Sequence, residues 1–308
     1  MRLPYKEKNE MDIAPLVTVY IPTWNRLNLL KRALHSVLEQ THTHLEVIVV
    51  DDQSTDGTQA YLQQLAATDR RVKPIFKTAN SGACVSRNLA IEQASGAYIT
   101  GLDDDDYFMP DRIETFVKQR ALLDKYCFLY THYLTLTGDN QYRSTRFVNR
   151  LMPAEICAQG LLFKNIIGSQ CFTLTERLRQ VGKFTPDMPA WQDLDLFYRL
   201  LKQTGFHKAK LLPHSLYIQD VSHDQNRISL SNKNRIRHAF TLFCARNDVS
   251  GKEQRILEAQ LVSYGIKVSN RHFLSRFTTW RAPYFWLVDI YLVIKNRANS
   301  RTHHLAEG

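Results

Sequence analysis

The sequence lacks the features that mark secreted, zinc-binding and membrane-spanning proteins. Its five cysteines are odd in number and scattered, without any Cys-x-x-Cys pair, which excludes a disulfide framework and a structural zinc site. No apolar run approaches the ~20 residues that cross a bilayer, and the nearest one, residues 284–294, is interrupted by Asp289. The first residues, MRLPYKEKNEMD, contain no apolar core of a signal peptide. We therefore expect a cytoplasmic protein with reduced thiols.

The chain also lacks internal repeats and linkers rich in glycine, serine or proline. With 308 residues, 44% of them hydrophobic and 23% charged, it is long enough for one large globular domain with an appendage. The net charge of +10 is unevenly distributed, because residues 1–200 hold 23 basic and 23 acidic side chains whereas residues 201–308 hold 17 and 7. This excess suggests a polyanionic partner. No basic element is interleaved with stacking aromatics, so we expect no nucleic acid.

Short apolar runs typical of buried strands alternate with helical patterns in the first half of the chain. This alternation predicts an α/β fold with a Rossmann-like, mostly parallel sheet flanked by helices on both faces. Ligands of such sheets bind at the carboxyl ends of the strands, where this sequence places polar residues. The expected strands are residues 17–21, 45–50, 72–77 and 97–102, and the expected helices are residues 27–40, 55–67 and 81–94.

The second half of the chain has a less regular pattern. We expect a helix over residues 110–123, strands over 126–135, 141–148 and 169–175, and helices over 176–181 and 193–203. From residue 231 onward the pattern is helical and basic, and the softest boundary lies at residues 222–234.

The strongest local signal is the run of four aspartates in GLDDDDYFMP, residues 101–110. Adjacent carboxylates repel one another unless a cation neutralises them, and a hard divalent cation that bridges to phosphates would do so. Side chains alternate along a strand, so Asp103 and Asp105 share one face and Asp104 and Asp106 the other. The alternative is a turn that caps the helix after Pro110, a role that Asp106 alone would fill.

A second acidic group, Asp51 and Asp52, ends the apolar strand in IVVDDQSTDGT. The residues after it have local roles, since Ser54 or Thr55 can cap the next helix and a turn suits Asp56 followed by glycine. Neither Asp51 nor Asp52 is needed for that. A carboxylate at the end of a strand accepts hydrogen bonds from a base imide or a ribose hydroxyl, as acidic residues do in nucleotide-binding folds.

Two further segments contain candidate functional residues near helix starts. In NSGACVSRN, Arg87 is placed to pair with a phosphate in bidentate fashion, although most such arginines are solvated helix residues. In PAWQDLDLFYRLL, Asp193 and Asp195 are both favoured by the helix dipole. Their position after a proline-rich loop also makes one of them a candidate general base.

In this order and spacing, these segments resemble the inverting nucleotide-sugar glycosyltransferases of family 2, which have the GT-A fold. The resemblance runs from about residue 15 to about residue 231. It rests on separate motifs that agree: VTVYIPTWNR, LHSVLEQT, VVDDQSTDGT, NSGACVSRN, the aspartate cluster and WQDLDLFYRL.

The resemblance implies a donor site, a metal site and a base. The residues that would hold the donor nucleotide are Pro22, Thr23, Asn25, Arg26, Asp51, Asp52, Arg87, Asp103 and Asp104. The D-x-D positions that bind Mn²⁺ or Mg²⁺ would be Asp103 and Asp105, with His223 completing the metal or phosphate site. Asp193 would be the catalytic base.

This chain departs from the family pattern in two places. Gln192 stands where relatives usually have glutamate, and the Gln-x-x-Arg-Trp motif and membrane helices of processive synthases are missing. The resemblance therefore implies transfer of one sugar to a glycan or lipid-linked glycan, as in lipopolysaccharide or capsule synthesis. It also implies an extension (1–14), a GT-A domain (15–230, with a donor half 15–110 and an acceptor half 111–230) and a basic helical region (231–308).

Two other functions stay open at this point. A sugar nucleotidyltransferase also uses Mg²⁺ and carboxylates, but it normally has a glycine-rich loop with basic residues after the first strand, where this chain has PTWN. A non-catalytic protein that binds nucleotide sugars or glycans on the same fold is the other, to which Gln192 lends some support.

The basic C-terminal region has two interpretations. Its mixture of basic and aromatic residues suits an anionic membrane surface, which would make the protein peripheral on the inner face of the cytoplasmic membrane. In the alternative, Phe285, Leu287, Val288 and Leu292 pack a terminal helix onto the catalytic domain. The aromatic residues of this region are Phe273, Phe277, Trp280, Tyr284, Phe285, Trp286 and Tyr291.

Overall fold

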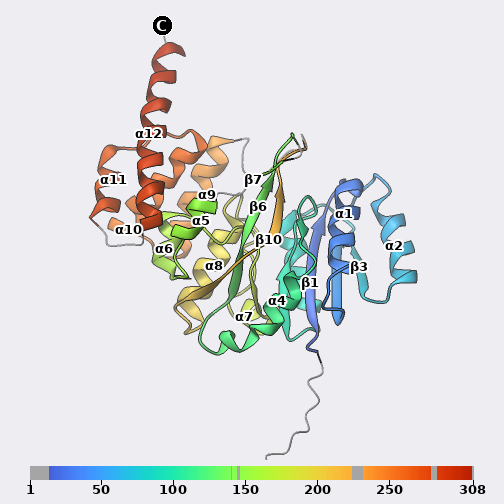
Figure 1. The fold of residues 1–308 in the computed structure, drawn as a ribbon. Coiled ribbons are helices and arrows are strands. Elements are labelled where there is room, and N and C mark those ends of the chain that lie inside the picture. The colour runs from blue at the N-terminus through green and yellow to red at the C-terminus, as the bar shows by residue number, and fades with distance from the viewer. Residues whose placement is uncertain (1–13, 140, 144–145, 224–231, 279–282, 307–308) are drawn as a thin grey trace, which may run out of the picture.

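The fold is built on one mixed sheet. A computed structural model describes residues 14–306 except 140, 144–145, 224–231 and 279–282. In this part of the chain, ten strands form a sheet whose main path is β3-β2-β1-β4-β9-β6-β10-β5, and β7 and β8 pair with β6 and β10 (Figure 1). The parallel strands are β1 (Val17–Thr23), β2 (Leu45–Asp51), β3 (Val72–Phe76) and β4 (Tyr98–Gly101). The predicted α/β fold is confirmed.

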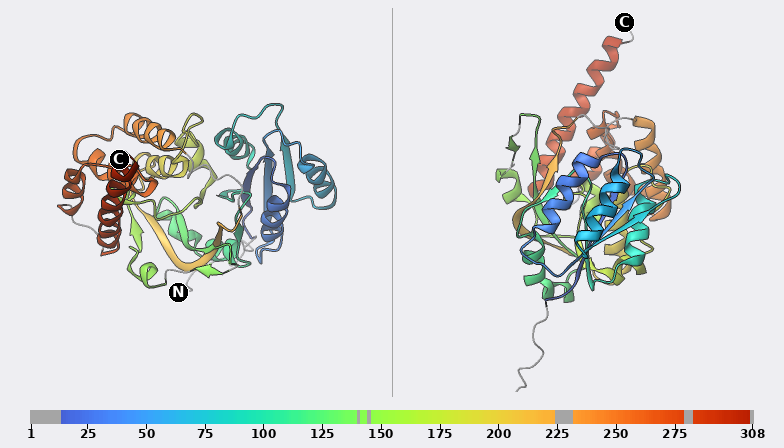
Figure 2. Two further views of the ribbon diagram at one scale, coloured as in Figure 1. Left: turned by 90° about the horizontal axis from the view of Figure 1, so that it is seen from above. Right: turned by 90° about the vertical axis from the view of Figure 1, so that its right-hand side faces the viewer.

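Alternating residues of these strands pack into two separate cores, because successive side chains of a strand point to opposite faces. Val17, Val19 and Ile21 pack in the core that includes α1 (Leu27–Leu38) and α2 (Thr58–Thr68). Tyr20, Ile48 and Val50 pack in the other core with α3 (Ala83–Gln93). Helices thus cover both faces (Figure 2), and the carboxyl ends of β1, β2 and β4 remain at one edge.

The second half of the sheet contains antiparallel strands. In chain order these elements are β5 (Tyr107–Phe108), α4 (Arg112–Lys118), η1 (Arg120–Asp124), β6 (Leu129–Leu136), β7 (Tyr142–Arg143), α5 (Arg146–Leu151), β8 (Glu155–Ile156), α6 (Ala158–Phe163), β9 (Phe172–Leu174), α7 (Thr175–Gln180), α8 (Gln192–Gln203) and β10 (Ala209–Asp220). Strand β10 runs parallel to β6 and antiparallel to β5 and β8.

Two sequence expectations for this half were wrong. The strand expected over 141–148 is a two-residue strand, β7, followed by helix α5. Strand β10 was not expected at all. Pro213 and its polar neighbours interrupt the apolar alternation, and the pairing of β10 with β6 shifts register on either side of Ser215.

The helices of the C-terminal region share a core with the sheet. They are α9 (Lys233–Arg246), α10 (Gly251–Glu258), η2 (Ala259–Tyr264), α11 (Asn270–Phe277) and α12 (Pro283–Ala306). Arg276 and Asp289 form a fully buried ion pair, and Arg276 also donates to the carbonyl oxygens of Phe163 (2.8 Å) and Ile256 (2.7 Å). Phe285 and Leu292 are buried, as the packing alternative expected, but Leu287 is exposed.

No described helix has the length and apolar character needed to cross a membrane. The N-terminal extension and most of the boundary at 222–234 lie outside the described residues, as does Trp280. The division of the chain at residues 14 and 230 stays a prediction.

Candidate active site

The aspartate cluster after β4 is joined to the end of β1. Thr23 Oγ1 donates a hydrogen bond of 2.9 Å to Asp104 Oδ2. Arg26 Nη1 donates to Asp104 Oδ1 and to Asp105 Oδ2, both at 3.1 Å. Burial raises the pKa of Asp104 to about 6, although Arg26 opposes the shift. The structure therefore brings together four residues that the sequence analysis had singled out.

Asp52, just after β2, holds the loop that leads into α3. Its carboxylate accepts hydrogen bonds from the backbone N–H groups of Ser81 (3.0 Å) and Gly82 (2.7 Å). Lys77, one residue after β3, forms a close ion pair with the same carboxylate, and both side chains are largely buried. Asp52 thus fixes this loop at the carboxyl ends of the parallel strands.

Asp51 and Asn25 shape the neighbouring turn. Asp51 Oδ2 accepts from the N–H of Ser54 at 3.1 Å, and its Oδ1 is buried and has no hydrogen-bond partner in the described part of the chain. Asn25 has a positive φ of 50° and accepts from the N–H of Thr55 at 2.7 Å, which ties the β1 turn to the β2 turn. Pro22 lies on β1 opposite residue 50 of β2 and is buried.

Arg87 connects the aspartate cluster to helix α8. Its Nη2 donates to Asp103 Oδ1 and its Nη1 donates to Gln192 Oε1, each at 2.8 Å. Gln170 Nε2 also donates to Asp103 Oδ1, at 3.2 Å. Gly101 permits this arrangement, since a side chain there would overlap Gln170. Arg87 is buried and paired, so its interpretation as a solvated helix residue is wrong.

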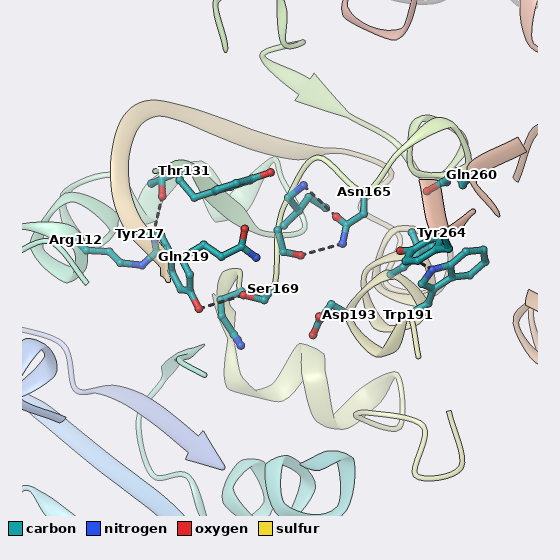
Figure 3. Close-up of a pocket in the computed structure, with 15 residues that line it drawn as sticks. Arg112, Thr131, Asn165, Ser169, Trp191, Asp193, Tyr217, Gln219, Gln260 and Tyr264 are labelled. Atoms are coloured by element: carbon teal, nitrogen blue, oxygen red, sulfur yellow. Dashed lines mark hydrogen bonds between the residues drawn. The ribbon is translucent and has the colours of Figure 1, made fainter. Parts of the chain in front are cut away.

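Asp193 lies in the first turn of α8 and lines a cavity of about 300 Å³ (Figure 3). Its Oδ1 atom is buried and has no hydrogen-bond partner among the described residues. Burial raises the pKa of Asp193 to about 7, with Arg87 opposing the shift and Asp103 adding to it. A carboxyl group with these properties is suited to accept a proton at neutral pH. Asp195 is instead fully buried and paired with Arg199, which is a structural role.

The cavity has an aromatic wall and a polar wall on opposite sides of Asp193 (Figure 3). Trp191 and Tyr264 form the aromatic wall, where Trp191 Nε1 donates to the Tyr264 hydroxyl at 3.0 Å. On the polar wall, Ser169 Oγ donates to the Tyr217 hydroxyl at 3.1 Å. Because Tyr264 belongs to η2, the C-terminal region contributes to the cavity that contains the candidate base.

The expected metal ligands are brought together only in part. His223 Nε2 lies 3.6 Å from Asp105 Oδ2, and both ring nitrogens of His223 are buried without a hydrogen-bond partner among the residues that the structure describes. Asp103 faces Arg87 instead. Within the part of the chain that the structure describes, no three His, Cys, Asp or Glu side chains form a ready-made metal cluster. The His223 ring nitrogens beside the Asp105 carboxylate nevertheless fit a divalent cation that takes its further ligands from a substrate.

Asp106 has a structural role different from the one expected. Its carboxylate accepts hydrogen bonds from the Tyr217 hydroxyl (2.7 Å) and from the N–H of Asp220 (2.9 Å). The residue that precedes α4 is Asp111, so the capping role considered for Asp106 is not observed. Asp106 fastens the aspartate cluster to β10.

Residues 18–178 match the model of glycosyl transferase family 2. The chain belongs to this family. It is therefore a glycosyltransferase, and the sugar nucleotidyltransferase alternative is wrong.

The names of two relatives of this family 2 chain assign them to bacterial polysaccharide synthesis. The chain is 36% identical over 220 residues to the putative colanic acid biosynthesis glycosyl transferase WcaA of Escherichia coli, which covers 71% of this chain and 77% of WcaA. It is also 36% identical over 194 residues to the putative teichuronic acid biosynthesis glycosyltransferase TuaG of Bacillus subtilis, covering 62% of this chain and 74% of TuaG.

Solved structures confirm the GT-A fold. Residues 1–349 of Staphylococcus aureus TarS, in complex with UDP-GlcNAc, superpose with a TM-score of 0.59 at 18% identity, covering 93% of this chain and 89% of that one. A mannosyltransferase from Pyrobaculum calidifontis, in complex with GDP-Man and Mn²⁺, gives a TM-score of 0.55 at 20% identity, covering 97% and 79%.

Several residues of this candidate site were not predicted from the sequence. Lys77 had a signal, because a charged residue at the end of the third expected strand lies beside the acidic ends of its neighbours. Gln170 and Tyr264 had none, since each lies far along the chain from the motifs it joins. Arg32 was also missed; it donates to Asp220 Oδ2 at 2.5 Å and to the Asp105 carbonyl at 2.6 Å.

Proposed function

We propose that this glycosyltransferase moves one sugar from a UDP-sugar to a hydroxyl of a glycan or lipid-linked glycan, with inversion, in the synthesis of a cell-surface polysaccharide. The names of the relatives from E. coli and B. subtilis support the polysaccharide context. The TarS complex with UDP-GlcNAc supports a UDP-sugar donor.

The buried, unpartnered Oδ1 of Asp193 at the cavity carries the proposal. This carboxylate takes the proton of the acceptor hydroxyl as that oxygen attacks the anomeric carbon. The bond between this carbon and the phosphate oxygen breaks, and the nucleoside diphosphate leaves with the electron pair. A single displacement inverts the configuration, so an α-linked donor gives a β-linked product. No second nucleophile is needed, because no covalent sugar intermediate forms.

The donor side of the site is assigned to the strand ends. Asp51 Oδ1 is buried without a partner and is available to a nucleoside N–H or hydroxyl. Asp52 and its bonded loop would form the wall beside the nucleoside. Arg87, held by Asp103 and Gln192, has a fixed guanidinium that favours the diphosphate. Pro22, Thr23, Asn25, Arg26 and Asp104 complete the donor set.

We assign the metal, Mn²⁺ or Mg²⁺, to Asp103, Asp105 and His223. The two ring nitrogens of His223 lie next to Asp105 and have no hydrogen-bond partner among the described residues, which supports this assignment. A bound divalent cation would supply Lewis-acid stabilisation of the charge on the departing diphosphate. Arg26 shares the Asp104 and Asp105 carboxylates and holds them in place at the cluster.

The acceptor is assigned to the cavity. Its aromatic wall offers apolar surface to a sugar ring, and its polar wall offers hydrogen bonds to hydroxyl groups. Tyr264 fixes the Trp191 ring through the hydrogen bond to its indole nitrogen.

Replacing the base is the decisive experiment. In Asp193→Asn, transfer of a radiolabelled sugar should fall by about 10²–10⁴-fold, while UDP-sugar binding measured by calorimetry stays near that of the wild type. Asp187→Asn, an exposed aspartate in the preceding loop, is the matched control and should retain full activity. Near-normal transfer by Asp193→Asn would refute the base assignment. A wild-type chain that binds UDP-sugars but transfers none to any glycan would contradict the proposed transfer.

A further inference from the structure

Helix α12 has two apolar faces, and the rest of the chain covers only one of them. Phe285, Val288 and Leu292 follow an i, i+3, i+7 spacing and pack into the core, where Phe285 lies against Phe163. On the opposite side, four side chains with i, i+3, i+4, i+7 spacing are 39–63% exposed. This exposed stripe consists of Leu287, Ile290, Tyr291 and Ile294.

The exposed stripe continues onto α11. Trp286 is 46% exposed and its ring centroid lies 5.8 Å from that of Phe277 on α11. Leu274, one turn before Phe277, is 64% exposed. Among the described residues, ten large apolar side chains are exposed, and six of them lie on these two helices. Such a concentration is typical of an interaction surface rather than of ordinary scattered exposure.

The charge around the exposed stripe is strongly basic. Residues 265–308 contain seven Lys and Arg against two Asp and Glu. Arg276 and Asp289 are paired and fully buried, so neither contributes to the surface, which leaves six Lys and Arg against one Glu in this segment. Lys267, just before α11, and Arg271, in its first turn, are both exposed. The surface thus combines apolar side chains with an excess of positive charge.

We propose that the exposed stripe docks on an anionic lipid surface, with α12 lying in the plane of the interface. Trp, Tyr, Leu and Ile side chains would enter the boundary between headgroups and acyl chains, and the flanking Lys and Arg would contact anionic headgroups. The charge favours lipid over a second copy of the chain, because a two-fold contact would bring two basic surfaces together. Docking of this kind does not require a spanning helix, which matches the described helices.

The docking surface is connected to the cavity of the site. Helix α12 packs against η2, and η2 contributes Gln260 and Tyr264 to the cavity that holds Asp193. The end of α12 projects from the body (Figure 1; Figure 2). Resting on the proposed function, this contact joins the docking helix to an element of the acceptor wall, which suits an acceptor that is carried on a lipid.

Vesicle cosedimentation of the full chain, without donor or acceptor, tests the docking. The wild type should bind vesicles of phosphatidylglycerol and phosphatidylcholine, bind pure phosphatidylcholine at least about tenfold more weakly, and lose binding as salt is raised. Ile290→Gln with Ile294→Gln should weaken partition by at least about tenfold. Tyr142→Gln, an exposed apolar residue on β7, is the matched control and should bind normally.

A second pair of variants tests the charge. Lys267→Gln with Arg271→Gln should reduce binding to anionic vesicles, whereas Arg70→Gln with Lys125→Gln, exposed elsewhere, should not. Normal binding by the Ile290/Ile294 variant, or equal binding to neutral vesicles, would overturn the proposal. So would a dimer in light scattering that the same variant dissociates. Transfer to a soluble acceptor should be unchanged in these variants, so loss of docking and loss of glycosyl transfer are distinguishable.

Discussion

Gln192, the residue before the proposed base Asp193, accepts a hydrogen bond of 2.8 Å from Arg87. A glutamate at this position would place a second negative charge beside Asp193. Like charges disfavour ionisation, so Gln192→Glu should raise the pKa that governs transfer by a few tenths to about one unit. Comparison of pH–rate profiles measures the shift. Gln203→Glu, at the exposed far end of α8, should leave the profile unchanged. An unshifted profile in Gln192→Glu would argue against Asp193 as the group that titrates.

The wild-type pH profile follows from the raised pKa of Asp193. A base works only when deprotonated, and burial raises the pKa of this carboxyl to about 7. The rate should therefore increase as the pH rises through about 7 and fall away below it. Measurement of kcat/KM under constant ionic strength checks this expectation, and a rate that stays flat from acidic to mildly basic pH contradicts it.

Metal removal should stop the reaction. Exhaustive chelation is expected to abolish transfer, and Mn²⁺ or Mg²⁺ should restore it. His223→Ala should raise the metal concentration for half-maximal activity by about 10–100-fold if it is a ligand. His214→Ala, an exposed histidine on β10, serves as the control. Full activity after exhaustive chelation would show that transfer does not depend on a metal.

Tyr264 should affect the acceptor more than the donor. Tyr264→Ala removes the ring beside Trp191 and is expected to raise the KM for the acceptor by about tenfold, which corresponds to 1.4 kcal/mol of binding. Tyr264→Phe keeps the ring but loses the hydroxyl that accepts from Trp191, and should have an intermediate effect. Calorimetry with UDP-sugar should show unchanged donor affinity in both. A weaker affinity for UDP-sugar in either variant would contradict the assignment of Tyr264 to the acceptor.

The buried pair of Arg276 and Asp289 should be critical for stability. Asp289→Asn leaves a buried arginine without its charge partner, which typically costs about 3–5 kcal/mol of unfolding free energy. Chemical denaturation should show a lower midpoint. Asp187→Asn breaks an exposed pair with Arg246 at 3.7 Å and should change stability by less than about 0.5 kcal/mol. Equal midpoints for the two variants would contradict the importance of the buried pair.

The parallel half of the sheet was predictable because its residues carry a local signal. Apolar strands that end in polar residues identified β1, β2, β3 and β4 within a few residues, and with them Thr23, Arg26, Asp52 and Asp104. Alternation of strands and helices then requires their carboxyl ends to meet. Thr23 and Arg26, which bond to the aspartate cluster, were predictable because they lie at or just after the carboxyl end of β1.

The remainder depends on contacts between distant residues. Strand β10 was missed because a proline and a register shift hide its alternation. Gln170 and Tyr264 reach the site through tertiary packing, and no spacing along the chain connects them to Asp103 or Trp191. The sequence did not indicate which face of α12 is buried and which is the exposed stripe, because both faces are apolar.

The aromatic wall of the cavity has a consequence for how such enzymes diversify. Tyr264 and Gln260 lie outside residues 18–178, the segment that matches the family, whereas Asp51, Asp52, Arg87 and the aspartate cluster lie within it. Under the proposed assignment of the cavity to the acceptor, changes in the last quarter of the chain would reshape the acceptor side, whereas the proposed donor residues would stay as they are. A chimaera that exchanges this quarter with that of a relative would then inherit its partner's acceptor and keep its own nucleotide sugar.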